Sequence, residues 1–325
     1  MHRILITDYE FESIDQEQAV ADANGVELVR AHCRTEDEVL QYAAEADALI
    51  VQYAPISERV INNLPRLKAI SRYGVGVDNV DVAAATRRGV AVSNVPDYGV
   101  EDVSDHAIAL ALTLARGIPD LDRGVRSGRN PLPSVQPLHR FSAQTFGVIG
   151  LGLIGAATAA KAKALGFRTL GYDPLHLPGT TTGEGVQVVS FEELLAESDV
   201  VSLHVPLNKH THHLIDAAAL EQFKEGATLV NTCRGAVVDT EALVDALKNG
   251  PIKGAGLDVF EEEPLPLDSA LLALDGVVLT PHTAWYTEES NHELKRRTAQ
   301  NAVDVCLNRQ PRNILNPEVL PISAG

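Results

Sequence analysis

Three ionisable residues with complementary chemistry follow short apolar segments in the second half of the chain: Arg234, Glu263 and His282. A guanidinium can hold a carboxylate by two parallel hydrogen bonds. A histidine can exchange a proton near neutral pH, and a carboxylate beside it favours the imidazolium and fixes the ring. Taken singly, Arg234 could be a surface ion-pair residue and His282 a core histidine. Together, and with a nicotinamide site between them, they indicate hydride transfer coupled to proton transfer.

A glycine-rich turn supplies the candidate cofactor site. The apolar segment 145–149 runs into Gly150-Leu151-Gly152-Leu153-Ile154-Gly155, which opens a helical pattern. Such glycines allow a tight turn, close approach to a pyrophosphate and close packing of helix on strand. Asp173 ends the next strand, eighteen residues after Gly155. A carboxylate there can accept both adenosine ribose hydroxyls and would repel a 2′-phosphate, so the pattern predicts NAD rather than NADP.

The elements that must position these residues alternate between strand-like and helix-like segments, which is typical of parallel sheets with helices on both faces. We expect strands at 3–8, 48–51, 69–71 and 91–93, and a second series at 145–150, 168–173, 187–189, 200–205, 228–232, 254–259 and 277–280. We expect helices at 14–24, 36–44, 100–115, 155–165, 191–196, 217–223, 240–249 and 288–308. The segment 116–140 has no clear period and predicts an irregular connection.

This order predicts an α/β protein with two doubly wound parallel-sheet domains. Residues 101–287 would form a Rossmann-type NAD-binding domain. Residues 1–100 would form a flavodoxin-like substrate-binding domain, made discontinuous by the return of residues 288–325.

Composition narrows the possible partners. Lys and Arg total 27 against 44 Asp and Glu, a net charge of −17, which disfavours nucleic acid and anionic membrane surfaces. We find no uncharged apolar run of the roughly 18 residues that a membrane span needs. The acidic turn after the short apolar start does not resemble a secretory signal. The three cysteines suit a reducing cytoplasm, and the histidines near His204 lack the cysteine and acidic partners of a metal site, so we expect none.

Five motifs together resemble a known family. They are Gly74-Val75-Gly76-Val77-Asp78-Asn79-Val80-Asp81, the turn at 150–155, Asn231-Thr232-Cys233-Arg234-Gly235, Asp258-Val259-Phe260-Glu261-Glu262-Glu263-Pro264 and Thr280-Pro281-His282. In this order they resemble the D-isomer-specific 2-hydroxyacid dehydrogenases. Residues 282–286 and 212–215 are most similar to the branch related to the C-terminal-binding-protein corepressors. The resemblance implies an NAD-dependent oxidoreductase for a 2-keto/2-hydroxy acid pair, and a homodimer formed through residues 100–140. The alternative is an NAD(H)-sensing interaction protein with little turnover.

The resemblance also implies roles for individual residues. Arg234 would anchor and polarise the substrate, His282 would donate a proton to the keto oxygen with Glu263 as its partner, and amides near Val75 and Gly76 would hold the substrate carboxylate. Arg72 favours an acidic substrate and Trp285 an apolar one, a conflict that the sequence leaves open. Leu153 replaces a polar or basic residue and removes a possible pyrophosphate contact. The implied cofactor contacts are Val103, Gly150, Gly152, Leu153, Ile154, Gly155, Asp173, His204, Val205, Pro206, Thr211, Thr232, Cys233 and Asp258.

Overall fold

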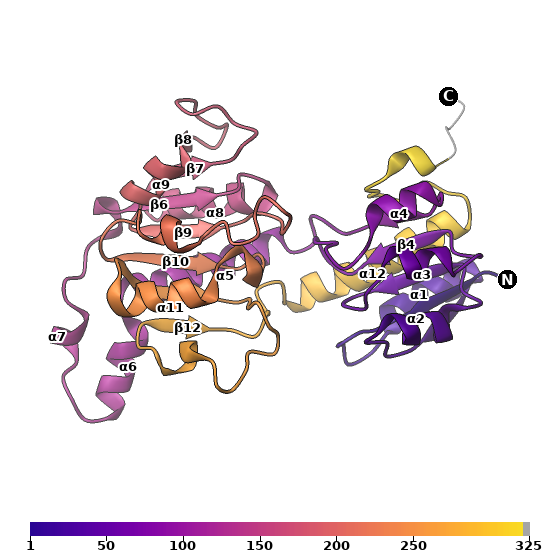
Figure 1. Ribbon diagram of the computed structural model, residues 1–325, viewed down its shortest axis with the longest axis horizontal. Coiled ribbons are helices and arrows are strands. Elements are labelled where there is room, and N and C mark those ends of the chain that lie inside the picture. Colours follow the sequence, from indigo (N-terminus) through magenta and orange to yellow (C-terminus); the bar gives the residue numbers. More distant parts are fainter. Residues whose placement is uncertain (321–325) are drawn as a thin grey trace. The chain divides into compact units, whose positions relative to one another are not determined.

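A computed structural model describes residues 1–320 of the chain. The chain divides into two compact units, one formed by residues 1–98 together with the segment from Thr287 onward, and the other by Gly99–Tyr286 (Figure 1). Each unit contains one sheet in which every pair of neighbouring strands is parallel. The predicted α/β class with two parallel sheets is therefore confirmed.

The first unit has a five-stranded sheet in the order β2-β1-β3-β4-β5. Its strands are β1 (Arg3–Ile6), β2 (Glu27–Arg30), β3 (Ala48–Val51), β4 (Ala69–Arg72) and β5 (Ala91–Ser93). All four residues of the central strand β3 are buried, as expected for a parallel strand covered on both faces. The register pairs Val51 with Arg72, so β3 and β4 end side by side.

Helices cover both faces of this sheet. They are α1 (Asp15–Asn24), α2 (Glu36–Ala43), α3 (Glu58–Asn62), α4 (Val82–Arg87) and α12 (Glu288–Cys306), with a short 3-10 helix at Pro317–Val319. Helix α12 packs on α1 and on β3, β4 and β5, while α2 contacts α3 and α3 contacts α4. The last long helix of the chain thus completes the unit that the first 98 residues begin.

The second unit has a seven-stranded sheet in the order β12-β11-β10-β9-β6-β7-β8. Its strands are β6 (Thr145–Ile149), β7 (Arg168–Tyr172), β8 (Gln187–Val188), β9 (Val200–Leu203), β10 (Ala227–Asn231), β11 (Ile252–Leu257) and β12 (Val277–Leu279). The chain runs outward from β6 to β8, then returns to pair β9 with β6 and runs outward on the other side. Ligands of such sheets bind where this reversal occurs, at the carboxyl ends of the strands.

The helices of the second unit are α5 (Val100–Ala115), α6 (Ile118–Arg126), α7 (Leu132–Val135), α8 (Leu153–Ala164), α9 (Phe191–Glu197), α10 (Ala217–Leu220) and α11 (Thr240–Asn249), with 3-10 helices at Phe141–Ala143, Gly235–Val237 and Ala270–Ala273. Helices α5 and α8 share one core cluster with Phe146 and Val148. Helices α9, α10 and α11 contribute to another cluster with Ile149 and Leu229. No helix within residues 1–320 is long and apolar enough to span a membrane.

Two segments differ from the sequence prediction. Strand β2 was not expected, because Glu27–Arg30 is a partly exposed edge strand with charged residues at both ends. The segment 116–140 is not wholly irregular, since it contains α6 and α7. Helix α6 begins at a proline-containing turn and includes Gly124, where a Cβ would lie 2.3 Å from Pro131. The close contact with Pro131 therefore requires a glycine at position 124, and that glycine makes the helix hard to predict from the sequence.

Candidate active site

The predicted cofactor and catalytic residues of the second unit follow successive strands of one sheet. Residues Tyr172, Ile149, Leu203, Asn231, Leu257 and Leu279 are the last residues of β7, β6, β9, β10, β11 and β12, and they are joined in register from strand to strand. Asp173, Gly150, His204, Arg234, Asp258 and His282 come within three residues after those ends. Because parallel strands end at one edge, the fold gathers these residues along that edge.

The glycine turn has the shape of a phosphate-binding cradle. A Cβ on Gly150, whose φ is +92°, would lie 2.4 Å from the carbonyl oxygen of His204, and one on Gly155 would lie 1.9 Å from that of Gly150. These two glycines let β6, β9 and α8 approach closely. A Cβ on Gly152 would meet no atom within 4 Å, so this glycine faces open space at the N-terminus of α8. The turn therefore fits a pyrophosphate that approaches the backbone there.

A second observation supports the fit to a dinucleotide. The Thr232 hydroxyl, just beyond β10, is buried and has no hydrogen-bond partner within residues 1–320. A buried hydroxyl of this kind calls for an explanation, and a bound polar ligand supplies one. Beside it, burial raises the pKa of the Cys233 thiol, which the N–H groups of Arg234 and Val205 only partly offset. The thiol is therefore protonated and is not an activated nucleophile.

The structure gives Asp173 and His204 specific partners. Asp173 accepts hydrogen bonds from the N–H groups of Leu151 (2.9 Å) and Leu175 (2.8 Å). It thus braces the glycine turn as well as facing the site. Burial lowers the pKa of His204 to about 3, so its imidazole is neutral, and its Nε2 lies 2.9 Å from the Ser202 hydroxyl. His204 accordingly adds no positive charge for a pyrophosphate.

Arg234 is positioned by the glycine that follows it. A Cβ on Gly235 would lie 1.9 Å from the carbonyl carbon of Phe260, so glycine allows the segments after β10 and β11 to pack backbone against backbone. The carbonyl of Arg234 accepts a hydrogen bond from the Asn231 amide at 2.8 Å, and its Nη1 donates to the carbonyl of Cys233 at 2.7 Å. This packing carries the guanidinium toward the segment that holds Glu263.

Glu263 and His282 form an ion pair, with Oε2 2.7 Å from Nδ1. The Phe260 N–H donates to the other oxygen of Glu263 at 2.9 Å. Burial alone would raise the pKa of Glu263, but the hydrogen bond and charge of His282, together with the Phe260 N–H and the charge of Arg234, bring it below its ordinary value. The three residues singled out first from the sequence are therefore close enough to interact electrostatically.

His282 has a left-handed backbone, with φ of +55°, which is uncommon for a residue with a side chain. Asp258 holds it: its carbonyl accepts the His282 N–H at 2.7 Å, and its buried carboxylate accepts the N–H groups of Thr283 and Ala284, both at 2.9 Å. In this structure Asp258 therefore fixes the turn that presents His282. Its predicted contact with the cofactor stays a prediction.

His106 of α5 was not identified from the sequence. Its Nε2 lies 2.9 Å from the Thr280 hydroxyl, which donates to Asp258 Oδ1 at 2.5 Å. His106 Nε2 is itself 3.6 Å from the same carboxylate oxygen. The partners of His106 are distant in sequence, so no local pattern reveals them. The one signal in the sequence is its position three residues after Val103, which places both on the same face of a helix.

For the remaining predicted residues of this unit, the structure shows burial and local contacts. Val103 is half-buried on α5, Ile154 is half-buried in the first turn of α8, and Leu153 beside it is 60% exposed. The Thr211 hydroxyl donates to the carbonyl of Pro206 at 2.5 Å and so closes the loop after β9. Trp285 is half-buried and packs edge-to-face on Tyr286.

In the first unit, Arg72, Val75 and Gly76 lie at and after the carboxyl end of β4. The Asn94 amide donates to the carbonyl of Val75 at 2.7 Å, and Arg72 Nη1 would lie 2.4 Å from a Cβ on Gly74. The guanidinium therefore folds back over its own loop. Tyr73 anchors that loop from within, because its hydroxyl donates to the buried Glu17 at 2.7 Å.

Asp8, another residue that was not predicted, organises the adjacent strand end. Its buried carboxylate accepts the N–H groups of Gln52, Tyr53 and Ala54, which directly follow β3. Since β3 and β4 end side by side, Asp8 shapes the loop next to the one that begins at Arg72. Its partners are more than forty residues away in sequence, so no local pattern could reveal them.

Comparison with known proteins places the chain in a family. The family described as "D-isomer specific 2-hydroxyacid dehydrogenase, NAD binding domain" matches residues 108–284. A glyoxylate reductase of Korarchaeum cryptofilum is 41% identical over 288 residues, which cover 87% of each chain. The chain belongs to the D-isomer-specific 2-hydroxyacid dehydrogenases. Among solved members of similar fold, D-lactate dehydrogenase from Aquifex aeolicus, complexed with NAD and lactic acid, has a TM-score of 0.86 at 30% identity and covers 96% of this chain and 99% of its own.

Another solved structure has a similar fold but a different substrate class and cofactor. An acyclic imino acid reductase in complex with NADPH and D-Arg has a TM-score of 0.86 at 28% identity, covering 97% of this chain and 100% of its own. As a D-isomer-specific 2-hydroxyacid dehydrogenase, the chain is an NAD-dependent oxidoreductase, and the predictions of family and cofactor are confirmed. The relatives favour an enzyme over an interaction protein. Membership of the corepressor-like branch stays a prediction.

Proposed function

We propose that this dehydrogenase interconverts a small 2-keto acid and its D-2-hydroxy acid, with Arg234, Glu263 and His282 as the catalytic set. The observation that carries the proposal is the ion pair of 2.7 Å between Glu263 and His282, with the charge of Arg234 beside it. Bound NADH supplies the hydride that reduces C2, and the protein must supply the proton and the substrate contacts.

His282 is the proton donor. Its Nδ1 faces Glu263, so Nε2 is the nitrogen available to a substrate. As C2 gains a hydride and the carbonyl double bond becomes single, the proton passes from Nε2 to the former keto oxygen. In the reverse direction neutral His282 removes the hydroxyl proton. Glu263 stabilises the imidazolium and keeps the ring in one orientation.

The guanidinium of Arg234 binds the substrate carboxylate and polarises the keto group. The amides near Val75 and Gly76 are proposed to bind a substrate carboxylate. Arg72 folds over Gly74, which supports a role in shaping this loop rather than in gripping a second acidic group. Together with the similarity to glyoxylate reductase, this favours a small substrate such as glyoxylate, and Trp285 is proposed to line the apolar side of the substrate pocket.

A substrate panel tests this proposal directly. Glyoxylate, pyruvate, hydroxypyruvate and a branched keto acid are each mixed with NADH, and the loss of the reduced nicotinamide absorbance is followed. The proposal expects turnover with at least the smallest acids, and expects the product of pyruvate to be the D isomer. Production of L-lactate, or tight NADH binding without turnover of any 2-keto acid, would overturn it.

We also propose a homodimer formed through residues 100–140. Helices α6 and α7 expose Ile118 (50%), Val125 (69%) and Leu132 (47%), apolar side chains that a second copy could cover. Light scattering after gel filtration should give twice the mass of 34.9 kDa, and a monomer at micromolar concentration would refute the proposal. The three cysteines are free, with Cys33 and Cys306 buried, which supports a cytoplasmic location.

A further inference from the structure

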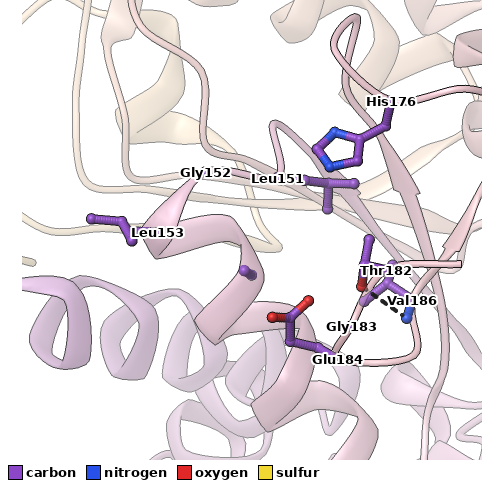
Figure 2. Close-up of a pocket in the computed structure, with 9 residues that line it drawn as sticks. Leu151, Gly152, Leu153, His176, Thr182, Gly183, Glu184 and Val186 are labelled. Carbon is purple, nitrogen blue, oxygen red and sulfur yellow. Dashed lines mark hydrogen bonds between the residues drawn. The ribbon is translucent and has the colours of Figure 1, made fainter.

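A cavity of about 500 Å³ adjoins the glycine turn on the side of Asp173. Its walls come from the turn and the first residues of α8, from His176, and from the loop between β7 and β8. Figure 2 shows His176 and Glu184 on different sides of this pocket, with Leu151 between them. The cavity lies where the adenosine end of a dinucleotide on this turn would be bound, and the matching family model describes an NAD-binding domain.

Asp173 lies behind the wall of this cavity, beside the lining residues Leu151 and His176, and its carboxylate is less available than the sequence suggests. Its side chain is only 15% exposed, and each oxygen already accepts a backbone N–H, from Leu151 and from Leu175. In addition, Nδ1 of His176 lies 3.7 Å from Oδ1 of Asp173. Asp173 can still accept from a ribose because a carboxylate has about four acceptor positions, but these donors disperse its negative charge. Repulsion of a 2′-phosphate by Asp173 alone is correspondingly weakened.

Glu184 is the one acidic residue among the nine that line the cavity, and it stands on a well-braced loop. The Thr182 N–H donates to the carbonyl of Val186 at 3.0 Å, and the Gly185 N–H donates to that of Thr182 at 2.9 Å. Lys163 of α8 donates to the carbonyls of Glu184 (3.2 Å) and Gly185 (3.3 Å), which ties the tip of the loop to the helix. The loop thereby holds Glu184 beside the first turn of α8, where Figure 2 shows its side chain.

Glu184 is exposed, and its surroundings favour the ionised form of its carboxyl group. Hydrogen bonds from its own N–H and from the Thr182 hydroxyl, with a smaller contribution from the charge of His176, lower its pKa. Lys163 is engaged by backbone carbonyls, and among the nine residues that line the cavity His176 is the only one that can carry a positive charge. A 2′-phosphate in this cavity would therefore meet the carboxylate of Glu184, with Asp173 next to the wall and His176 as the one lining residue that can carry a positive charge.

We propose that Glu184 is a specificity-determining residue of the cofactor site: together with Asp173 it excludes dinucleotides that carry a phosphate on the adenosine 2′-oxygen. The family fold alone does not decide this, since a solved protein of the same fold contains NADPH. The inference rests on the placement of the dinucleotide at residues 150–155. It assigns part of the discrimination to a residue outside the motif that ends at Asp173.

The test is a binding titration without keto acid. NADH and NADPH are titrated separately into the wild type, Glu184→Gln and the control Glu192→Gln, and cofactor fluorescence gives the dissociation constants. Glu192 is an exposed acid in the first turn of α9, outside the cavity lining, so the control removes one charge from the same unit. We expect Glu184→Gln to tighten NADPH binding by roughly fivefold, the size expected for the loss of one exposed like-charge contact. The affinity of Glu184→Gln for NADH, and both affinities of Glu192→Gln, should stay within about twofold of the wild type.

Added salt provides a second readout. Because the exclusion is electrostatic, the preference of the wild type for NADH over NADPH should narrow as ionic strength rises, and should narrow less in Glu184→Gln. An unchanged NADPH affinity in Glu184→Gln, or the same gain in Glu192→Gln, would overturn the inference while leaving the NAD site intact. Failure of the folded wild type to bind NADH would instead overturn the placement of the cofactor. Asp173→Ala is less suitable, because it also removes the acceptor of the Leu151 N–H in the glycine turn.

Discussion

Replacing Glu263 by glutamine tests the proton-transfer chemistry with little change of shape. The variant keeps an oxygen that can face His282 Nδ1 but removes the negative charge 2.7 Å from it. The side chains of Glu263 and His282 are 32% and 26% exposed, so the pair is neither fully screened nor fully desolvated. A pair of this kind stabilises the charged side chains by about 1–2 kcal/mol, between the ranges for exposed and buried pairs. Loss of that energy shifts the midpoint of a pH profile by about one unit.

The assay is the pH dependence of kcat/KM for keto acid reduction at saturating NADH. Because reduction requires the imidazolium, the alkaline midpoint of the wild-type profile should move about one unit toward acid in Glu263→Gln. The profile for hydroxy acid oxidation, which requires neutral His282, should move in the same direction. The pKa of Glu263 is below its ordinary value in the wild type, so Glu263 itself stays ionised near neutral pH.

Glu262→Gln is the matched control, since Glu262 is the exposed neighbour of Glu263 in the same loop. Its profile should match that of the wild type within a few tenths of a pH unit at most, as expected of a solvent-screened charge. The assignment of Glu263 as the partner of His282 would be refuted by an unmoved midpoint in Glu263→Gln, or by an equal movement in Glu262→Gln.

Three further predictions follow from the same geometry. Gly152→Ala should leave thermal stability unchanged, because its Cβ meets no atom within 4 Å, yet weaken NADH binding at least roughly tenfold by meeting the pyrophosphate; unimpaired binding would contradict the placement of the cofactor. Leu153→Arg should tighten NADH binding by roughly threefold at low salt, with the gain lost at high salt; a salt-independent gain would refute the electrostatic explanation. Burial raises the pKa of Glu17, an effect that the Tyr73 hydrogen bond and the charge of Lys295 only partly offset. The folded state therefore binds more protons, and the free energy of unfolding should fall as pH rises from the ordinary glutamate range through the raised value; urea titrations should show a weaker fall for Glu17→Gln, and equal slopes would exclude this cause.

Several features could be predicted because local sequence specifies them. The turn at 150–155 is recognisable because its glycines follow a continuous apolar strand, and close backbone contacts of Gly150 and Gly155 require those glycines. Arg234 and His282 could be proposed as site residues because each comes three residues after the end of a strand of the same parallel sheet. The prediction of two domains rests on the alternating pattern and on a final helix without a following strand.

The missed features depend on contacts that are remote in sequence. His106 meets Thr280 across 174 residues, and Asp8 holds N–H groups that lie 44 to 46 residues away. Glu184 stands in a polar loop whose composition resembles any solvated connection, and only the fold shows that it borders the cavity beside the glycine turn. Strand β2 gains its order from pairing with β1 and not from its own apolar content.

The proton-donor role of His282 is tested most directly by measuring NADH binding and keto acid reduction in one preparation of His282→Gln. His292→Gln, which removes an exposed histidine of α12, serves as the control. The account predicts NADH affinity within about twofold of the wild type and a reduction rate lower by roughly 100-fold or more, the usual contribution of a general acid. A variant that binds NADH normally and reduces the keto acid at the wild-type rate would contradict it.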